Sequence, residues 1–231
     1  MGTETKNVLP KIVIYGTNLQ AATLWKMITQ EQQAIVEAFI IDRAYRKVDE
    51  FNGLPVVNSE DMVEKFPPSE YKICLSFAYK NMVHNRRNIF NRCKEMGYEI
   101  FTFVSKNAMV YTDNIGEGAN IYPGVLLAPF VKVGTGSFID FGCVIAHHTE
   151  IGDFNYMAPG VRFCGDITTD SNCFFGAASM VNNGCKLSKE VFVASNAKVT
   201  KNVKERGVVF TSKLKMQLDS FDMMKMMFKD N

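Results

Sequence analysis

The chain has 231 residues, of which 47% are hydrophobic and 22% charged, and this composition excludes a disordered or collagen-like protein. Its 26 basic and 24 acidic residues give a formal net charge of +2, so no basic field indicates nucleic-acid binding. No apolar run approaches the roughly 18–20 residues that span a bilayer, and the N-terminus lacks the segments of a signal peptide. We therefore expect a cytoplasmic protein without membrane insertion.

The first half of the chain alternates predicted strands and helices. The expected strands cover 11–15, 35–41, 72–77 and 99–104, and the expected helices cover 19–29, a segment from Ser59 that stops before Pro67, and 81–96. Asn52-Gly53 indicates a turn, and Gly97 stands where a C-cap glycine belongs. Strands that alternate with helices predict a parallel sheet. We therefore expect a Rossmann-like α/β domain over residues 1–105.

A nucleotide site is one interpretation of this domain. The first strand ends in Gly16-Thr17-Asn18 before a helix, whose N-terminal N–H groups are suited to a phosphate. Asp42 ends the second strand, where an acidic side chain can contact a ribose hydroxyl. However, the GxGxxG fingerprint is absent, which argues against a classical NAD site. The alternative is a loop that only connects a strand to a helix.

The second half carries a six-residue repeat that never slips. Every sixth residue from 115 to 199 is apolar except Thr169. The residue two positions earlier is mostly small or β-branched, and Asn155 and Ile167 are the exceptions. Glycines follow the apolar residue at Gly116, Gly134, Gly152 and Gly176, where we expect each corner to need a permissive backbone.

This periodicity fits neither a helix nor an ordinary strand, and it is typical of a parallel β-helix. Three hexads make an 18-residue coil, so residues 115–199 predict about five coils. The repeat is too regular for a β-sandwich with chance spacing. We expect the β-helix domain to cover 106–213, and residues 214–231 to hold a short amphipathic C-terminal helix.

The histidines point to a reactive centre in the β-helix. The chain has only His84, His147 and His148, and histidine is the side chain best suited to proton transfer near neutral pH. Because Ile145 is expected to point inward, His147 should lie near a corner. One full coil further on is Gly165, whose backbone N–H should stack beside it.

The hexads and the preceding α/β domain together resemble the NeuD-like family of bacterial sugar acetyltransferases. The most specific stretch is CVIAHHTEIGDFNYMAPGVRFCG, residues 143–165. The resemblance implies a left-handed β-helix, a homotrimer, acetyl-CoA as acyl donor and no metal. It also implies that His147 is the general base and that the Gly165 N–H holds the acyl oxygen.

Other site residues follow from the same resemblance. Contacts with CoA are expected at Gly165, Ala177 and Lys198, although a solvated surface lysine is the alternative for Lys198. His148 stands where relatives have an acidic residue, so it can orient His147, contact substrate or do neither. Tyr156 matches a position where some relatives have a second histidine near the acyl group, and a packed corner aromatic is its alternative.

The leading hypothesis is N-acetylation of a nucleotide-linked amino sugar in bacterial surface-polysaccharide biosynthesis. The first domain would bind the nucleotide through Gly16, Thr17, Asn18 and Asp42. An O-acetyltransferase of sialic acid or another free sugar is the alternative. A γ-type carbonic anhydrase needs three histidine ligands, and only His147 and the adjacent His148, expected to face a different way, lie in the β-helix. A non-catalytic solenoid is the remaining interpretation.

Overall fold

The computed structural model of the protein describes residues 9–211, which divide into two compact units. One unit, the α/β unit, comprises the chain up to Ser76 together with Cys93–Phe101. Of the described residues, the other, the β-helix unit, comprises Phe77–Arg92 and residues 102–211. This division differs from the expected boundary at residue 105, because residues 77–92 group with the β-helix. The expected C-terminal helix lies outside the described residues.

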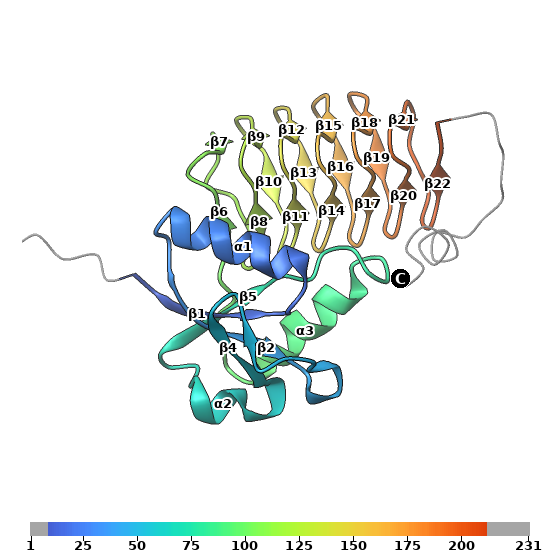
Figure 1. The fold of residues 1–231 in the computed structure, drawn as a ribbon. Helices are drawn as coiled ribbons and strands as arrows, with labels where there is room; N and C mark the ends of the chain where they lie inside the picture. The colour runs from blue at the N-terminus through green and yellow to red at the C-terminus, as the bar shows by residue number, and fades with distance from the viewer. Residues whose placement is uncertain (1–8, 212–231) are drawn as a thin grey trace, which may run out of the picture. The chain divides into compact units, whose positions relative to one another are not determined.

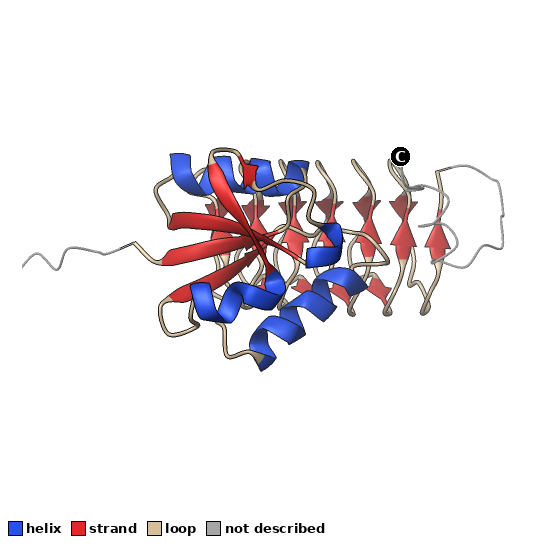
Figure 2. Cartoon of the chain, turned by 60° about the horizontal axis from the view of Figure 1, so that its bottom comes forward, coloured by secondary structure: helices blue, strands red, loops and turns tan. Residues whose placement is uncertain are grey.

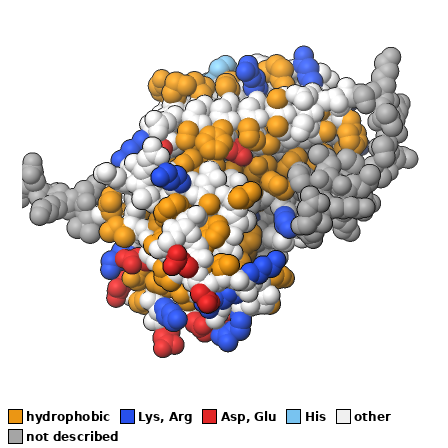
Figure 3. All heavy atoms as spheres, viewed as in Figure 1, with side chains coloured by type: hydrophobic (Ala, Val, Ile, Leu, Met, Phe, Trp, Pro, Cys, Tyr) orange, Lys and Arg blue, Asp and Glu red, His pale blue; other side chains and the backbone are white. Residues whose placement is uncertain are grey.

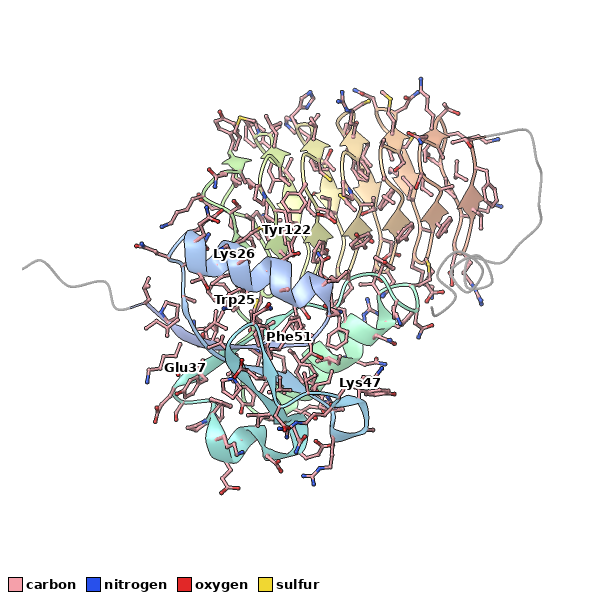
Figure 4. The ribbon with its side chains drawn as sticks, in the orientation of Figure 1. Trp25, Lys26, Glu37, Lys47, Phe51 and Tyr122 are labelled. Atoms are coloured by element: carbon pink, nitrogen blue, oxygen red, sulfur yellow. The ribbon has the colours of Figure 1, made fainter. Side chains whose placement is uncertain are left out.

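The α/β unit is built on a five-stranded sheet of order β3-β4-β2-β1-β5 (Figure 2). Only the β3–β4 pair is antiparallel. Phe51 of β3, which is labelled in Figure 4, packs edge-to-face on Phe39 of β2, with 5.0 Å between the ring centroids. The elements of this sheet and its connections are β1 Lys11–Tyr15, α1 Leu19–Gln30, β2 Ile35–Ile41, the 3-10 turn Arg43–Tyr45, β3 Glu50–Phe51, β4 Leu54–Asn58, the 3-10 turn Ser59–Asp61, α2 Met62–Lys65 and β5 Tyr71–Leu75. The Rossmann-like parallel sheet is thereby confirmed.

Two predicted elements of the first half differ from the structure. The strand expected at 99–104 is not a strand of this sheet: Ile100 forms a single bridge to Ile73, and Phe103–Val104 pairs within the β-helix. Helix α3 covers His84–Glu95 and not 81–96, because the three residues before it have positive φ angles. The side chain of Asn172 donates to the carbonyl of Met82 at 3.0 Å, and this long-range bond helps hold the left-handed turn.

The β-helix consists of three parallel sheets that form the faces of a prism (Figure 1). The seven-stranded sheet contains β6 Phe103–Val104, β8 Asn120–Ile121, β11 Phe138–Ile139, β14 Tyr156–Met157, β17 Phe174–Phe175, β20 Phe192–Val193 and β22 Val208–Val209. The six-stranded sheet contains β7 Met109–Val110, β9 Leu126–Leu127, β12 Val144–Ile145, β15 Arg162–Phe163, β18 Met180–Val181 and β21 Lys198–Val199. The four-stranded sheet contains β10 Lys132–Val133, β13 Glu150–Ile151, β16 Thr168–Thr169 and β19 Lys186–Leu187.

The stacking register confirms the predicted 18-residue coil. Val144 pairs with Arg162, and Arg162 pairs with Met180, so each strand lies beside the strand one coil away. The second residue of each strand points inward, and these residues form one continuous buried core. Burial of this column supplies the main stabilisation of the β-helix. The strands extend beyond the predicted repeat at both ends, to β6 and β22.

Two exceptions to the hexad pattern compensate for one another. Asn155 is fully buried, and its side chain donates to Thr169 Oγ1 at 2.9 Å and to the carbonyl of Asp170 at 2.9 Å. Its Oδ1 accepts from the backbone N–H of Cys173 at 2.7 Å. Two polar residues are therefore tolerated in the apolar core because they satisfy one another.

The corners of the prism share one backbone conformation. A positive φ recurs at every sixth residue, at Gly118, Gly124, Phe130, Gly136, Gly142, His148, Phe154, Gly160, Asp166, Asn172, Ala178, Gly184, Glu190 and Asn196. The expectation that Gly116, Gly134, Gly152 and Gly176 supply the permissive conformation is wrong, because none of them has a positive φ. They are glycines because a Cβ would meet the backbone of the next coil, at 2.4 Å from the carbonyl carbon of Gly152 in the case of Gly134.

Residues 77–92 are fastened to the β-helix by a buried arginine. Arg86 is fully buried, and its guanidinium donates to the carbonyls of Gly136 and Gly118 at 2.7 Å each and of Phe77 at 2.8 Å. The two glycines occupy the same corner in successive coils. Tyr79 also packs on Tyr156 and Phe174 of the seven-stranded sheet, at ring-centroid distances of 5.0 and 5.9 Å. This segment therefore covers aromatic residues that the sheet would otherwise expose.

The surface in Figure 3 carries acidic and basic side chains interspersed, mainly over the α/β unit. Within residues 9–211, no helix is long and apolar enough to cross a bilayer.

The inner glycines generate a stability prediction. Gly134→Ala places a methyl group against backbone atoms of the next coil, so we expect a loss of about 1–3 kcal/mol in the free energy of unfolding. Gly142→Asn is the matched control, because Gly142 has φ +67°, open space around it and a corner position that asparagine fills at 172 and 196. It should cost less than about 1 kcal/mol. Urea titration followed by circular dichroism measures both, and equal losses would contradict the close-approach explanation.

Candidate active site

His147 and His148 lie at the corner that joins the six-stranded sheet to the four-stranded sheet, between β12 and β13. Ile145 is fully buried in the core, as predicted, and the chain then turns so that both imidazoles are exposed. The hexad therefore dictates the location of His147: an inward residue fixes the register, and the corner two residues later projects the ring into solvent.

Gly165 occupies the same corner one coil further on and faces the imidazole of His147. A Cβ at Gly165 would lie 3.5 Å from Cε1 and 3.6 Å from Nε2 of His147. Its φ of +122° lies in the region that favours glycine. The N–H of Asp166 donates to the carbonyl of His147 at 3.0 Å, which ties the two corners together. The Gly165 N–H itself donates no hydrogen bond within residues 9–211, so a buried glycine has a donor available for a ligand.

His148 contacts His147 directly. The two Nδ1 atoms are 3.0 Å apart, and the rings meet edge-to-face with centroids separated by 5.2 Å. The expectation that the adjacent residues face different ways is wrong, because His148 has a φ of +57° and the left-handed turn brings both rings to one side. The His148 ring also packs against Phe130, at a centroid distance of 4.7 Å.

Tyr156 is placed away from this corner. It lies on the seven-stranded sheet, 5% exposed, between the rings of Phe138 and Phe174. Its hydroxyl donates to Asp140 Oδ2 at 3.2 Å. Burial raises the pKa of the Asp140 carboxyl, while hydrogen bonds from the Phe141 N–H and the Tyr156 hydroxyl partly oppose that increase. Within one chain, the geometry therefore favours a packing role for Tyr156 over the predicted substrate contact.

The expected CoA-contacting residues border the six-stranded sheet. Gly165 lies at one of its corners, Ala177 lies half-buried at the other, and the exposed side chain of Lys198 begins β21 on the sheet itself. The carbonyl of Ala177 accepts from the N–H of Asn196 at 2.8 Å, so Ala177 contributes to coil stacking. Their contact with CoA stays a prediction.

The predicted nucleotide residues gather at the carboxyl ends of the strands in the α/β unit. Gly16, Thr17 and Asn18 join β1 to α1, and the Asn18 side chain caps that helix by accepting from the N–H of Ala21 at 2.9 Å. The carboxylate of Asp42 accepts hydrogen bonds from the hydroxyls of Tyr15 and Ser59, the latter at 2.5 Å. In this sheet β1 is flanked by β2 and β5, so the loop after it lies at the switch point where ligands of such sheets bind.

Three residues that contact predicted site residues, Phe130, Tyr15 and Ser59, were not predicted from the sequence. Phe130 stands 18 residues before His148, so coil arithmetic predicts the contact once the corner at 148 is recognised. Tyr15 ends β1 and Ser59 follows β4, and both strands lie next to β2. No local pattern, however, distinguishes a hydroxyl that orients Asp42 from one that faces solvent.

The comparisons with known proteins agree with this architecture. No family model matches the chain. Over 89 residues it is 29% identical to GDP-perosamine N-acetyltransferase of Escherichia coli O157:H7, a match that covers 38% of this chain and 40% of that relative. The chain thus spans well under half of the curated relative it matches.

Solved structures match over most of the chain. The acetyltransferase domain of PglB from Neisseria gonorrhoeae, in complex with acetyl coenzyme A, aligns with a TM-score of 0.75 and 14% identity over 85% of this chain and 93% of that one. A histidine-to-alanine variant of GDP-perosamine N-acetyltransferase from Caulobacter crescentus, in complex with CoA and GDP-perosamine, aligns with a TM-score of 0.77 and 15% identity over 89% and 99%.

WeeI from Acinetobacter baumannii aligns with a TM-score of 0.70 and 23% identity, over 85% of this chain and 94% of that one. The predicted fold class is confirmed, since these neighbours are left-handed β-helix proteins. The resemblance to hexapeptide-repeat sugar acetyltransferases is also confirmed.

The Tyr156–Asp140 pair predicts a pH-dependent stability. An acid whose pKa is raised by folding contributes stability at low pH, and this contribution is lost as the pH rises from the ordinary Asp value, near 3.9, through the raised value. Tyr156→Phe removes one of the two hydrogen bonds that oppose the increase in the Asp140 pKa. We therefore expect it to destabilise by about 1.5–3 kcal/mol at pH 7 and by less near pH 3.

Urea titrations at the two pH values measure this difference. In an Asp140→Asn background, Tyr156→Phe should lose its pH dependence, because the titrating carboxyl is gone. The same destabilisation at both pH values in the Asp140 background would contradict the assignment.

Proposed function

We propose that the protein transfers the acetyl group of acetyl-CoA to the amino group of a nucleotide-linked amino sugar. The observation that carries the proposal is the facing pair at one corner of the β-helix: the Nε2 edge of His147 and the backbone of Gly165, whose N–H has no other acceptor among the described residues. A base and an oxyanion donor are the two groups that direct acyl transfer requires. The acetyltransferase names of the relatives support the same reaction.

The reaction follows from these two groups. The acceptor amine attacks the thioester carbonyl, and His147 Nε2 removes the proton that the nitrogen loses as the new C–N bond forms. The Gly165 N–H donates to the oxygen, which becomes negative in the tetrahedral intermediate. The C–S bond then breaks, and the proton held by His147 passes to the departing CoA thiolate. The products are the amide and CoA, and His147 returns to its neutral form.

The α/β unit supports the nucleotide-linked form of the acceptor. The Asp42 carboxylate is oriented by two hydroxyls at the carboxyl ends of the strands, beside the loop of Gly16, Thr17 and Asn18. This is the position where doubly wound sheets hold ribose and phosphate groups. The neighbour in complex with GDP-perosamine makes GDP-linked amino sugars the first acceptors to test.

A homotrimer is part of the proposal. Four of the exposed large hydrophobic residues, Met109, Tyr111, Phe130 and Phe141, lie on the six-stranded sheet or at its corners, the same region as His147. Their association with a second chain would remove apolar surface from water. Sedimentation velocity of the purified protein measures the mass of the assembly.

The histidine assignment predicts the outcome of a thiol-release assay. With acetyl-CoA and GDP-, UDP- or dTDP-linked amino sugars, His147→Ala should lower kcat by about 10²–10⁴-fold, because the general base is lost. His84→Ala is the matched control, since His84 pairs with Glu190 at 3.1 Å on another edge of the β-helix. Release with free sialic acid alone would favour the O-acetyl alternative. No release with any acceptor, together with no CoA binding by calorimetry, would favour a non-catalytic solenoid.

The Asp42 assignment predicts a change confined to one substrate. Asp42→Asn should raise the KM for the nucleotide sugar about tenfold, because a charge-assisted hydrogen bond is worth roughly 1.5 kcal/mol. The KM for acetyl-CoA should not change. Asp61→Asn is the control, since Asp61 is a nearby acidic residue paired with Arg43 at 3.1 Å. Equal increases in both KM values would indicate a general loss of structure and contradict a nucleotide contact.

A further inference from the structure

His148 occupies a corner position whose backbone is set by the fold. The equivalent position is glycine at six corners of the β-helix, asparagine at 172 and 196, aspartate at 166 and alanine at 178. At residue 148 the left-handed turn, with its N–H bonded to the carbonyl of Pro129 at 3.3 Å, directs the imidazole toward its neighbour His147. The contact between the two Nδ1 atoms at 3.0 Å is thus a consequence of the corner.

Phe130 fixes the plane of the His148 ring. It stands one coil earlier at the same corner, also with a positive φ (+68°), and its side chain is 68% exposed. An exposed aromatic ring in this backbone conformation is uncommon, and its contact here is the face of His148, at 4.7 Å and 36° between the rings. Phe130 therefore packs against the same imidazole whose Nδ1 contacts Nδ1 of His147.

The two nitrogens require one donor and one acceptor. In the proposed function, His147 accepts the substrate proton at Nε2, the nitrogen that faces Gly165. Its own proton must then be on Nδ1, which donates to Nδ1 of His148. His148 can accept only as a neutral ring with its proton on Nε2. We propose that His148 is the positioning residue of the site: a neutral imidazole, held by Phe130, that fixes the tautomer of His147.

This proposal rests on the proposed function and adds a property that a carboxylate in the same place would not give. A carboxylate remains an acceptor through mildly acidic pH, but an imidazole stops accepting once it binds a second proton. Both rings must then be neutral for activity, so log kcat/KM should fall toward acid pH with a limiting slope near 2. Cys164 and Asp166 are the titratable side chains on the neighbouring corner. On the four-stranded sheet, Lys132 and Glu150 form an ion pair with each other, with 2.6 Å between Nζ and Oε1.

Three substitutions separate positioning from packing, and the fold accepts each of them at this corner. His148→Asn keeps a neutral acceptor that cannot bind a proton, so kcat should stay within about threefold and the acid slope should fall to about 1. His148→Asp keeps an acceptor and should also show a slope near 1. His148→Ala removes the acceptor and should lower kcat by about 10–100-fold, with the KM for acetyl-CoA unchanged.

Phe130→Ala should also lower kcat, but by less than His148→Ala, because it releases the His148 imidazole without removing it. Val63→Ala is its control, because Val63 is an exposed hydrophobic residue on α2, outside the proposed subunit surface. If His148→Ala keeps both the kcat and the acid slope of the unmodified protein, the proposal is wrong.

The decisive measurement is ¹⁵N NMR of the histidine rings in the full-length protein, which has only three histidines to assign. We expect the Nδ1–H tautomer for His147 and the Nε2–H tautomer for His148 above neutral pH, and His148→Asn should leave His147 unchanged. A proton on Nε2 of His147 would overturn the proposal. The tautomers are observable without turnover, so failure of acetyl transfer with the expected tautomers would count against the proposed function and not against the ring arrangement.

Discussion

The rest of the β-helix depends on the backbone ladder that joins each residue to the one a coil away. Because a strand such as β12 is bonded to β9 on one side and β15 on the other, every side chain is stacked above an equivalent side chain. The second residue of each strand must then be apolar, apart from Thr169, which is hydrogen-bonded to the buried Asn155. The same ladder places Gly165 beside His147, although the two are 18 residues apart in sequence. The candidate site is thus a direct consequence of the coil length.

A second constraint acts at the corners, where one residue in six adopts a left-handed conformation. Glycine, asparagine and aspartate tolerate it best, yet phenylalanine and histidine occupy it at 130 and 148, where their rings contact one another and His148 also meets His147. The conformation belongs to the coil, because Phe154, Ala178 and Glu190 adopt it at other corners of the prism. The inner glycines follow a different rule, since they avoid a clash between successive coils.

The segment before and within α3 shows how far local patterns extend. Its apolar spacing predicts a helix from residue 81, but tertiary bonds from Asn172 and the burial of Met82 and Val83 move the helix start to His84. Arg86 reads locally as one of several polar residues on an exposed helix face. Only the assembled β-helix presents the two corner carbonyls, at Gly118 and Gly136, that accept from its guanidinium and permit full burial of the charge.

The sequence alone determined the fold class, the coil length, the inward residues and the location of His147, because a strict six-residue period admits one stacking register. It also located the loop at Gly16–Asn18 and Asp42, since parallel strands end at a common edge. The tertiary structure decided the contact of His147 with His148 and the packing of Phe130 on His148. It also decided that Tyr156 is buried on the seven-stranded sheet, and that residues 77–92 are held on the β-helix. Each of these depends on how side chains meet at a corner or on a contact between distant segments, and neither is encoded in local periodicity.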